Sequence, residues 1–334
     1  MKIYITGSAS VLSTDSRVEF SPTGDYVGLY NINYSDYIKP ALIRRMSKVI
    51  RMAVSSAKIA LEKANTSMPE AIIVGTGLGC LTDTKRFLSD LCTSKEGVIS
   101  PTAFIQSTHN TIAGQIALLI NCNGYNSTYS DRNHSFEQAL QDAKLHLIEG
   151  NDSVLVGAAD EDIDMIEKVV NSIAESHKPL VAPKGFFLGE GSSFFVVSRI
   201  KKPGSITLEA LKLFPRISKL ELRAETLNFL SENDLNPGDI DVAILGDWPS
   251  SGDHYYEVIE ELFEKTTPMV YYKKQSGQYF TSSAYALDTA CSILINQTIP
   301  KSMLPTSDTP GEIRNILIYN NYKGAKHSFY LISK

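Results

Sequence analysis

The stretch GNDSVLVGAADE, residues 150–161, decides the fold of this chain. A glycine turn precedes an apolar run at 153–158, and the acidic residues Asp160 and Glu161 follow shortly after it. A short apolar run of this kind is typical of a strand buried on both faces of a parallel sheet. Outward from it, apolar runs alternate with helix-like periodicity. This alternation predicts an α/β fold with largely parallel strands.

The expected elements fall into two comparable series. We expect strands at 2–7, 71–76, 153–158, 193–198, 205–212, 241–246, 315–320 and 327–333, and helices near 40–64, 109–121, 135–149, 160–175, 217–232, 254–265 and 281–296. The turn-rich IKKPG at 200–204 predicts a boundary between an N-terminal half, 1–200, and a C-terminal half, 201–334. Ligands bind at the carboxyl ends of strands in open α/β sheets, so we expect chemistry after residues 76, 129, 158, 246 and 320.

Composition excludes several classes of function. With 334 residues and 43% apolar content the chain can bury a large core, and its net charge of −5 argues against a general nucleic-acid binder. The apolar runs are too short for a membrane span, and no signal-peptide pattern opens the sequence, so we expect a cytoplasmic protein. The four cysteines (Cys80, Cys92, Cys122, Cys291) lack metal-ligand spacing. We interpret them as buried free thiols and expect no metal site.

Three segments carry a family resemblance. PTAFIQSTHNTIAGQIAL (101–118), GNDSVLVGAADE (150–161) and SHKPLVAPKGFFLGEGSSFFVV (176–197) resemble, in this order, the nucleophile region of the β-ketoacyl synthases. The resemblance implies a thiolase-like fold layered αβαβα, with two similarly ordered halves. The rest of the chain matches only loosely, and the chain is shorter than a typical synthase.

In that family a cysteine thiolate accepts an acyl group from a carrier protein, and the start of a helix lowers its pKa. This cysteine lies nineteen residues after the glycine that matches Gly114 and seventeen before the one that matches Gly150. Both counts place Asn133 in the cysteine position. The helix expected at 135–149 would still present its N-terminus there. The resemblance therefore implies a synthase frame without the nucleophile.

Two histidines complete the family's condensation chemistry. LGDWPSSGD (245–253) puts Leu245 in the first histidine position. In KKQSGQYF (273–280), Lys273 matches the family's lysine and Gln278 occupies the second histidine position. NYKGAKHSFYLIS (321–333) places Tyr322 on an aromatic gate and Gly324 on a loop glycine. Two acidic positions of the family match Glu161 and Glu190, which we interpret as residues that satisfy buried backbone groups and hold loops.

The three replacements imply a chain-length-factor-type subunit, similar to the short synthase-like proteins of aryl-polyene and flexirubin pathways. Such a subunit pairs with an active ketosynthase as a heterodimer; a homodimer is also open. No cofactor is expected beyond the phosphopantetheine arm of an acyl carrier protein. Two alternatives remain. One is an active acyltransferase or condensing enzyme that uses Ser130 with His134 or His109, and the other is a homodimeric acyl-binding protein.

The basic stretch KPALIRRMSKVIR, residues 39–51, contains no acid. On one helix, Arg44, Lys48 and Arg51 share a face. That face, with Arg45, is either simply solvated or a dock for an acidic acyl carrier protein and its phosphate.

Overall fold

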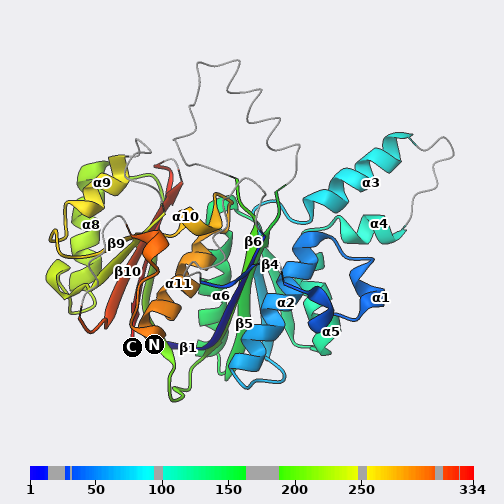
Figure 1. The fold of residues 1–334 in the computed structure, drawn as a ribbon, viewed down its shortest axis with the longest axis horizontal. Coiled ribbons are helices and arrows are strands. Elements are labelled where there is room, and N and C mark those ends of the chain that lie inside the picture. The colour runs from blue at the N-terminus through cyan, green and yellow to red at the C-terminus, as the bar shows by residue number, and fades with distance from the viewer. Residues whose placement is uncertain are drawn as a thin grey trace.

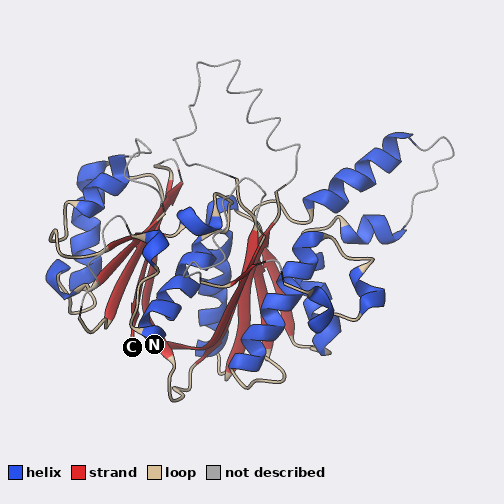
Figure 2. Ribbon diagram, viewed as in Figure 1, coloured by secondary structure: helices blue, strands red, loops and turns tan. Residues whose placement is uncertain are grey.

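The computed structural model describes residues 1–13, 27–30, 32–93, 101–162, 188–246, 254–304, 311–322 and 324–334. Across these residues helices and strands form five layers, helix, sheet, helix, sheet and helix, which run from side to side in Figure 1. Figure 2 shows the two groups of strands separated by the central helices. The expected αβαβα layering is confirmed.

The two halves repeat one strand order. The N-terminal half contains β1 (Ile3–Leu12), β3 (Ala71–Gly75), β4 (Tyr125–Tyr129), β5 (Ser153–Asp160) and β6 (Gly191–Ser198), and a short β2 (Leu29–Tyr30) pairs with β1. The C-terminal half contains β7 (Ile206–Phe214), β8 (Val242–Leu245), β9 (Met269–Tyr271), β10 (Asn315–Tyr322) and β11 (Lys326–Ser333). The order β4-β3-β5-β6-β1 is mirrored by β9-β8-β10-β11-β7, with the same parallel and antiparallel pairings. The chain is therefore two copies of one topology.

β1 joins the two copies. It pairs along its length with β6 and, through Ile3–Ile5, with β7. Beyond Ile5 it no longer pairs with β7, so the two half-sheets separate around the central layer.

The layers follow from where apolar side chains fall on each helix. The outer helices α2 (Lys48–Lys63) and α5 (Thr111–Ile120) pack on the N-terminal half, and α8 (Lys219–Ser231) and α9 (His254–Glu260) on the other. The central helices are α6 (Ser135–Ile148) and α11 (Ser283–Asn296). Most of α11 is buried, as expected for a helix covered on both sides. The remaining helices are α1 (Pro40–Ile43), α3 (Leu81–Thr93), α4 (Pro101–Gln106) and α10 (Lys273–Ser276).

Some expected elements are wrong. The single helix 40–64 is two helices, because Ser47 is extended (φ −65°, ψ 167°) and starts α2 anew after α1 ends at Ile43. The strands β4 and β9 and the helices α3 and α4 are absent from the expected set. Asp160 still belongs to β5, and most of the helix expected at 160–175 lies outside the described residues.

The cysteine expectation holds for three of four residues, since Cys92 is exposed while Cys80, Cys122 and Cys291 are buried free thiols. Within the described ranges, no helix is both long and apolar enough to cross a bilayer.

Candidate functional site

A tight turn carries Asn133 into the start of α6. β4 ends at Tyr129, and a 3-10 turn, Arg132–His134, leads directly into the helix. Arg132 adopts φ +52°, an uncommon conformation for a side chain other than glycine. Ser135 fixes the turn, because its hydroxyl accepts a hydrogen bond from the Asp131 N–H (2.8 Å) and donates to the Arg132 carbonyl (2.7 Å). The backbone thus holds residue 133 at the positive end of a 14-residue helix.

Asn133 is buried there without a hydrogen-bond partner. Its side chain is 2% exposed, and neither its amide nitrogen nor its amide oxygen has a partner among the described residues. Buried polar atoms are almost always paired, so such an orphan indicates water, a ligand or a partner protein. An amide also cannot form the thiolate that the family's chemistry requires.

His134, the next residue, is also buried. Burial lowers its pKa to about 4, and the positive charge of Lys326 acts in the same direction. The imidazole is therefore neutral at pH 7. Its Nε2 has no hydrogen-bond partner in the described part of the chain.

Asp131 is anchored from the last strand. The Lys326 ammonium on β11 forms an ion pair with the Asp131 carboxylate and donates to the Asp131 carbonyl (2.9 Å). The Gln138 amide donates to the same carboxylate (2.9 Å). The sequence interpretation did not include Lys326 in the site, because nothing local to residues 130–135 indicates that β11 lies beside them.

Ser130 stands apart from these groups. It is exposed at the end of β4, and across the described ranges no hydrogen bond joins it to His134 or His109. A serine nucleophile needs a base within hydrogen-bond reach. The present geometry does not supply that contact.

A second feature, a pocket of about 170 Å³, lies where strands of both halves end. Its walls come from residues that follow β3 and β5, that precede β6, and that lie between α10 and α11: Leu78, Asp160, Glu161, Asp162, Leu188, Gly189, Gln278, Tyr279 and Phe280, with Tyr322 of β10. Three residues from the sequence interpretation, Glu161, Gln278 and Tyr322, meet here. Asn133 follows β4 at the same edge of the sheet but does not line this pocket.

Asp160 holds the pocket together. Its Oδ1 accepts from the Thr76 hydroxyl and from the Gly77 N–H, and its Oδ2 accepts from the N–H and hydroxyl of Thr281. Burial raises the pKa of this carboxyl, and these hydrogen bonds oppose the rise. Asp160 thus ties loops of both halves, a role that the acid directly after an apolar strand could have indicated.

Tyr322, expected from the resemblance to be an aromatic gate, contacts the ring of Phe280. The Tyr322 ring lies edge-on to the Phe280 ring, with centroids 6.0 Å apart. A side chain at Gly77 would collide with Phe280, so that glycine is required by close approach. Gly324, at φ +61°, is the loop glycine expected beside the gate.

The acidic residues act on loops as interpreted. Glu161 accepts a hydrogen bond from the Thr82 N–H (2.8 Å) at the start of α3. Glu190 accepts from the Asp162 N–H (3.3 Å) and forms an ion pair with Lys48.

The structure does not bring three of the expected residues to either feature. Leu245 is fully buried in the outer core between the C-terminal half-sheet and α8 and α9. Lys273 is buried at the start of α10, with its ammonium 5.8 Å from the Tyr272 ring centroid. Gly114 lies inside α5, within the helix expected at 109–121, and a Cβ there would meet nothing within 4 Å. Beyond Gly246, the rest of the segment 245–253 lies outside the described residues.

The basic residues gather in a hollow of about 740 Å³ between α1, α2, α3 and α4. Arg44, Arg45, Lys48 and Arg51 line it together with Arg86, Asp83 and Asp90. The prediction that Arg44, Lys48 and Arg51 share one helix face is wrong, because Arg44 caps α1 while Lys48 and Arg51 belong to α2. Lys48 is moreover paired with Glu190. The hollow, not a helix face, brings these cations together.

Comparisons with known proteins agree with the geometry. Residues 31–184 match the family model described as "Beta-ketoacyl synthase, N-terminal domain". Among solved structures, "The ishigamide ketosynthase/chain length factor" aligns with TM-score 0.76 at 16% identity and covers 100% of this chain and 99% of that chain. The fold is that of the β-ketoacyl synthases.

Other structures align equally fully with this ketosynthase-like chain. "AntDE:AntF", described as a type II PKS acyl-carrier protein in complex with its ketosynthase, has TM-score 0.73 and 15% identity and covers 99% of both chains. The ketosynthase ApeO in complex with its chain length factor ApeC, from Xenorhabdus doucetiae, has TM-score 0.71 and 15% identity, covering 99% of this chain and 97% of that chain. No curated protein matches the chain in sequence.

Metal-ligating side chains do not gather in the ketosynthase-like fold as far as it is described, where no three His, Cys, Asp or Glu residues are placed to hold an ion.

Proposed function

We propose that this chain is a chain-length-factor-type subunit that pairs with an active ketosynthase in acyl-chain elongation and does not itself condense. The observation that carries the proposal is Asn133, a buried amide without a partner among the described residues, at the helix start where the family's nucleophile would stand. It keeps the positive helix end while lacking a nucleophile.

The edge strand β4 supports a protein partner. Among the described strands it pairs only with β3, which leaves one row of backbone groups open for another chain. Large apolar side chains are exposed on the elements that flank it: Tyr125 on β4, Leu118 on α5, and Leu145 and Ile148 on α6. Exposed apolar surface around a free edge favours association.

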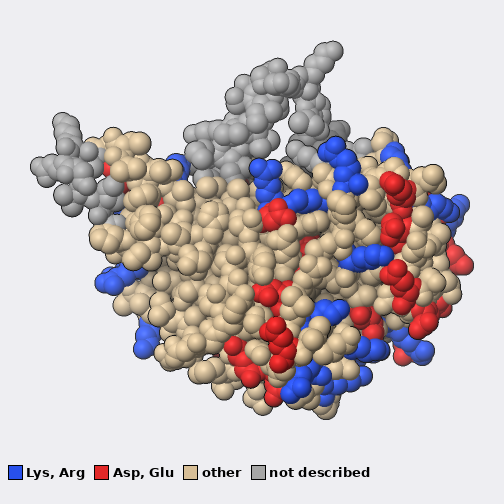
Figure 3. Space-filling view, turned by 180° about the vertical axis from the view of Figure 1, so that it is seen from behind, with Lys and Arg blue, Asp and Glu red and all other residues tan. Residues whose placement is uncertain are grey.

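Charge distribution points the same way. Figure 3 shows the face of the molecule that is turned away from the viewer in Figure 1. Few charged side chains lie on the half of this face that the N-terminal elements form, and many lie on the other half, on the side of α8 and α9. Interface cores are depleted of charge. Because Asn133 follows β4 directly, a partner on β4 would lie close to it.

The basic hollow supports contact with an acyl carrier protein. Arg44, Arg45, Arg51 and Arg86 outnumber the acids Asp83 and Asp90 among its lining residues. Arg51 is held in place, since its guanidinium lies 5.4 Å from the Tyr34 ring centroid. Fixed arginines suit a phosphate or an acidic helix. The expected cytoplasmic location and the absence of a cofactor stay predictions.

One experiment tests the function. The chain is expressed alone and together with an active ketosynthase from the same organism, and each preparation is incubated with acyl-loaded carrier protein. We expect co-purification of the two chains, an acyl adduct only on the synthase cysteine, and elongation only by the pair.

Two other outcomes would favour the alternative functions. A stable adduct on Ser130 of the chain alone would favour the acyltransferase alternative. A homodimer that retains acyl carrier protein without any adduct, and ignores the synthase, would favour an acyl-binding protein.

A further inference from the structure

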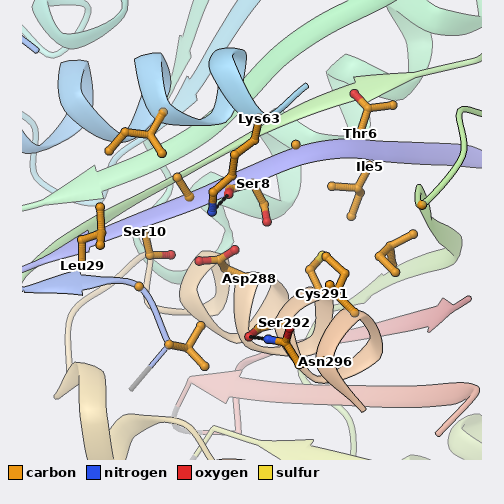
Figure 4. A pocket seen from close by; sticks show the side chains of 18 residues that line it. Ile5, Thr6, Ser8, Ser10, Leu29, Lys63, Asp288, Cys291, Ser292 and Asn296 are labelled. Carbon is orange, nitrogen blue, oxygen red and sulfur yellow. Dashed lines mark hydrogen bonds between the residues drawn. The ribbon is translucent and has the colours of Figure 1, made fainter. Parts of the chain in front are cut away.

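A cavity of about 490 Å³ lies away from both site features, in the wedge where β1 leaves β7. Its lining comes from β1, residues 27–29 at β2, the end of α2, the start of β7 with Gly204 before it, and one face of α11. Figure 4 shows the side chains that surround it. Neither the chain-length-factor function nor the carrier hollow uses this space.

Asp288 forms the floor of the cavity. It projects from α11, is 5% exposed, and has neither a hydrogen bond nor an ion pair through its carboxylate within the described residues. In Figure 4 the carboxylate points toward β1 and the end of Lys63. A carboxylate that faces a cavity and has no partner among the described side chains is suited to bind a cation there.

The nearest lysine is engaged elsewhere. Lys63 is exposed at the end of α2 and donates its ammonium hydrogen to the Ser8 carbonyl at 2.8 Å. No ion pair joins it to Asp288 in the described part of the molecule. The cavity between them is therefore open to another positive group.

The side chains that line the cavity indicate what kind of molecule would bear the positive group. Ile5, Ala9, Ile59 and Ile206 line the interior, and two large apolar side chains at the cavity, Leu29 and Ile295, are 40% and 52% exposed. Other polar lining side chains are engaged within the protein: the Thr6 hydroxyl donates to the Val196 carbonyl (3.2 Å), the Ser10 hydroxyl is bonded to the Ser193 hydroxyl (2.7 Å), and the Asn296 amide donates to Ser292 (3.2 Å). A bare metal ion would find only one carboxylate here. An ammonium group on an apolar body matches both the floor and the walls.

We propose that this cavity binds a small organic ammonium ligand, with its charged nitrogen on Asp288 and its apolar body against Leu29 and Ile295. The site is independent of Asn133 and of the proposed partner.

The test compares matched probes. Isothermal titration at pH 7.5 measures binding of 2-phenylethylammonium and n-butylammonium against n-pentanol, which lacks the charge. We expect the amines to bind at least tenfold more tightly than the alcohol. Asp288→Asn should weaken amine binding tenfold or more. Glu62→Gln is the control, because it removes one exposed negative charge from α2 without lining the cavity.

Two results would overturn the proposal. One is equal binding of the amines and pentanol, or unchanged amine binding in Asp288→Asn. The other comes from thermal unfolding without ligand. We expect Asp288→Asn to keep or raise the melting temperature, since it removes an uncompensated charge. If Asp288→Asn and Lys63→Met each lower it, and the double variant lowers it no further, Lys63 is the counter-ion and the cavity needs no ligand.

Discussion

Lys326, from the last strand, forms an ion pair with Asp131, two residues before the buried Asn133. It also donates to the Asp131 carbonyl. A residue of the C-terminal half therefore fixes the turn that opens the central helix of the N-terminal half. The same ammonium helps to keep His134 uncharged.

Replacing Lys326 should alter the protonation of His134. In Lys326→Met, we expect the His134 pKa to rise above about 4 but to stay below 6.5, because burial is the larger cause of its depression. The lost pair should cost about 1 kcal/mol of stability. NMR titration of the histidine signals and denaturant unfolding measure both effects. An unchanged His134 pKa would contradict the assignment.

His134 also predicts a pH dependence for the native chain. Its folded pKa is depressed, so the unfolded chain binds more protons between pH 6.5 and about 4. Stability is full above pH 6.5 and should fall by about 2 kcal/mol as the pH drops through this window, with a reduction for solvent screening. In His134→Phe this part of the acid loss should disappear. Equal acid slopes in both proteins would refute it.

Glu137 predicts the opposite slope. It is fully buried in the first turn of α6, and burial raises its pKa, while its Oε1 accepts from the Ser328 hydroxyl (3.1 Å). A raised folded pKa gives stability that is present below the unfolded pKa and lost as pH rises. Glu137→Gln should therefore be more stable than the native chain at pH 7.5, and no more stable at pH 4. Unfolding at the two pH values measures the difference, with Glu62→Gln as an exposed control.

A charge introduced beside β4 tests whether the partner binds at this edge. Leu118→Asp should weaken association with the ketosynthase at least tenfold while leaving the stability of the isolated chain within about 0.5 kcal/mol. Leu220→Asp is the matched control, because Leu220 is 79% exposed on α8 in the other half. Analytical ultracentrifugation of mixtures measures both. Equal loss in the two variants would argue against an interface at β4.

A substitution at Gly114 can have different effects on the stability of the isolated chain and on partner binding. Nothing lies within 4 Å of a Cβ at this position, so Gly114→Ala should stabilise the isolated chain by about 0.5–1 kcal/mol through its higher helix propensity. One turn before Leu118, it should also weaken partner binding if the partner packs closely. A destabilised isolated chain would show that the space at Gly114 is not open.

Sequence reasoning recovers the buried parts of this fold best. Strands such as Ala71–Gly75 and Ser153–Asp160 are continuous apolar runs, and their burial follows from that alone. The edge strand Tyr125–Tyr129 reads as polar YNSTY, and its place beside β3 comes from tertiary pairing. A strand end is expected from the sequence at residue 129, but none of the expected strands includes that residue.

Some residues of the candidate site can likewise be predicted from the sequence, and others cannot. Asn133 at the start of its helix follows from counting between two glycines. The anchors Lys326 and Asp160 do not, because each acts across a long sequence separation. Leu245 shows the limit of motif matching, since its side chain faces the outer core and not the central layer.

The position of β1 has a consequence for how the molecule forms. The Thr6 hydroxyl on β1 bonds to a carbonyl on β6 that lies 190 residues later in sequence, and β7, farther still, also pairs with β1. Closing such distant contacts is slow, because chain entropy is lost before they form. During synthesis most of β1 stays unpaired until residues 191–214 emerge, because β2 pairs only with its last two residues, Val11 and Leu12. The first strand of the chain therefore closes the N-terminal half-sheet when β6 emerges, and it joins the C-terminal half to that sheet when β7 pairs with Ile3–Ile5.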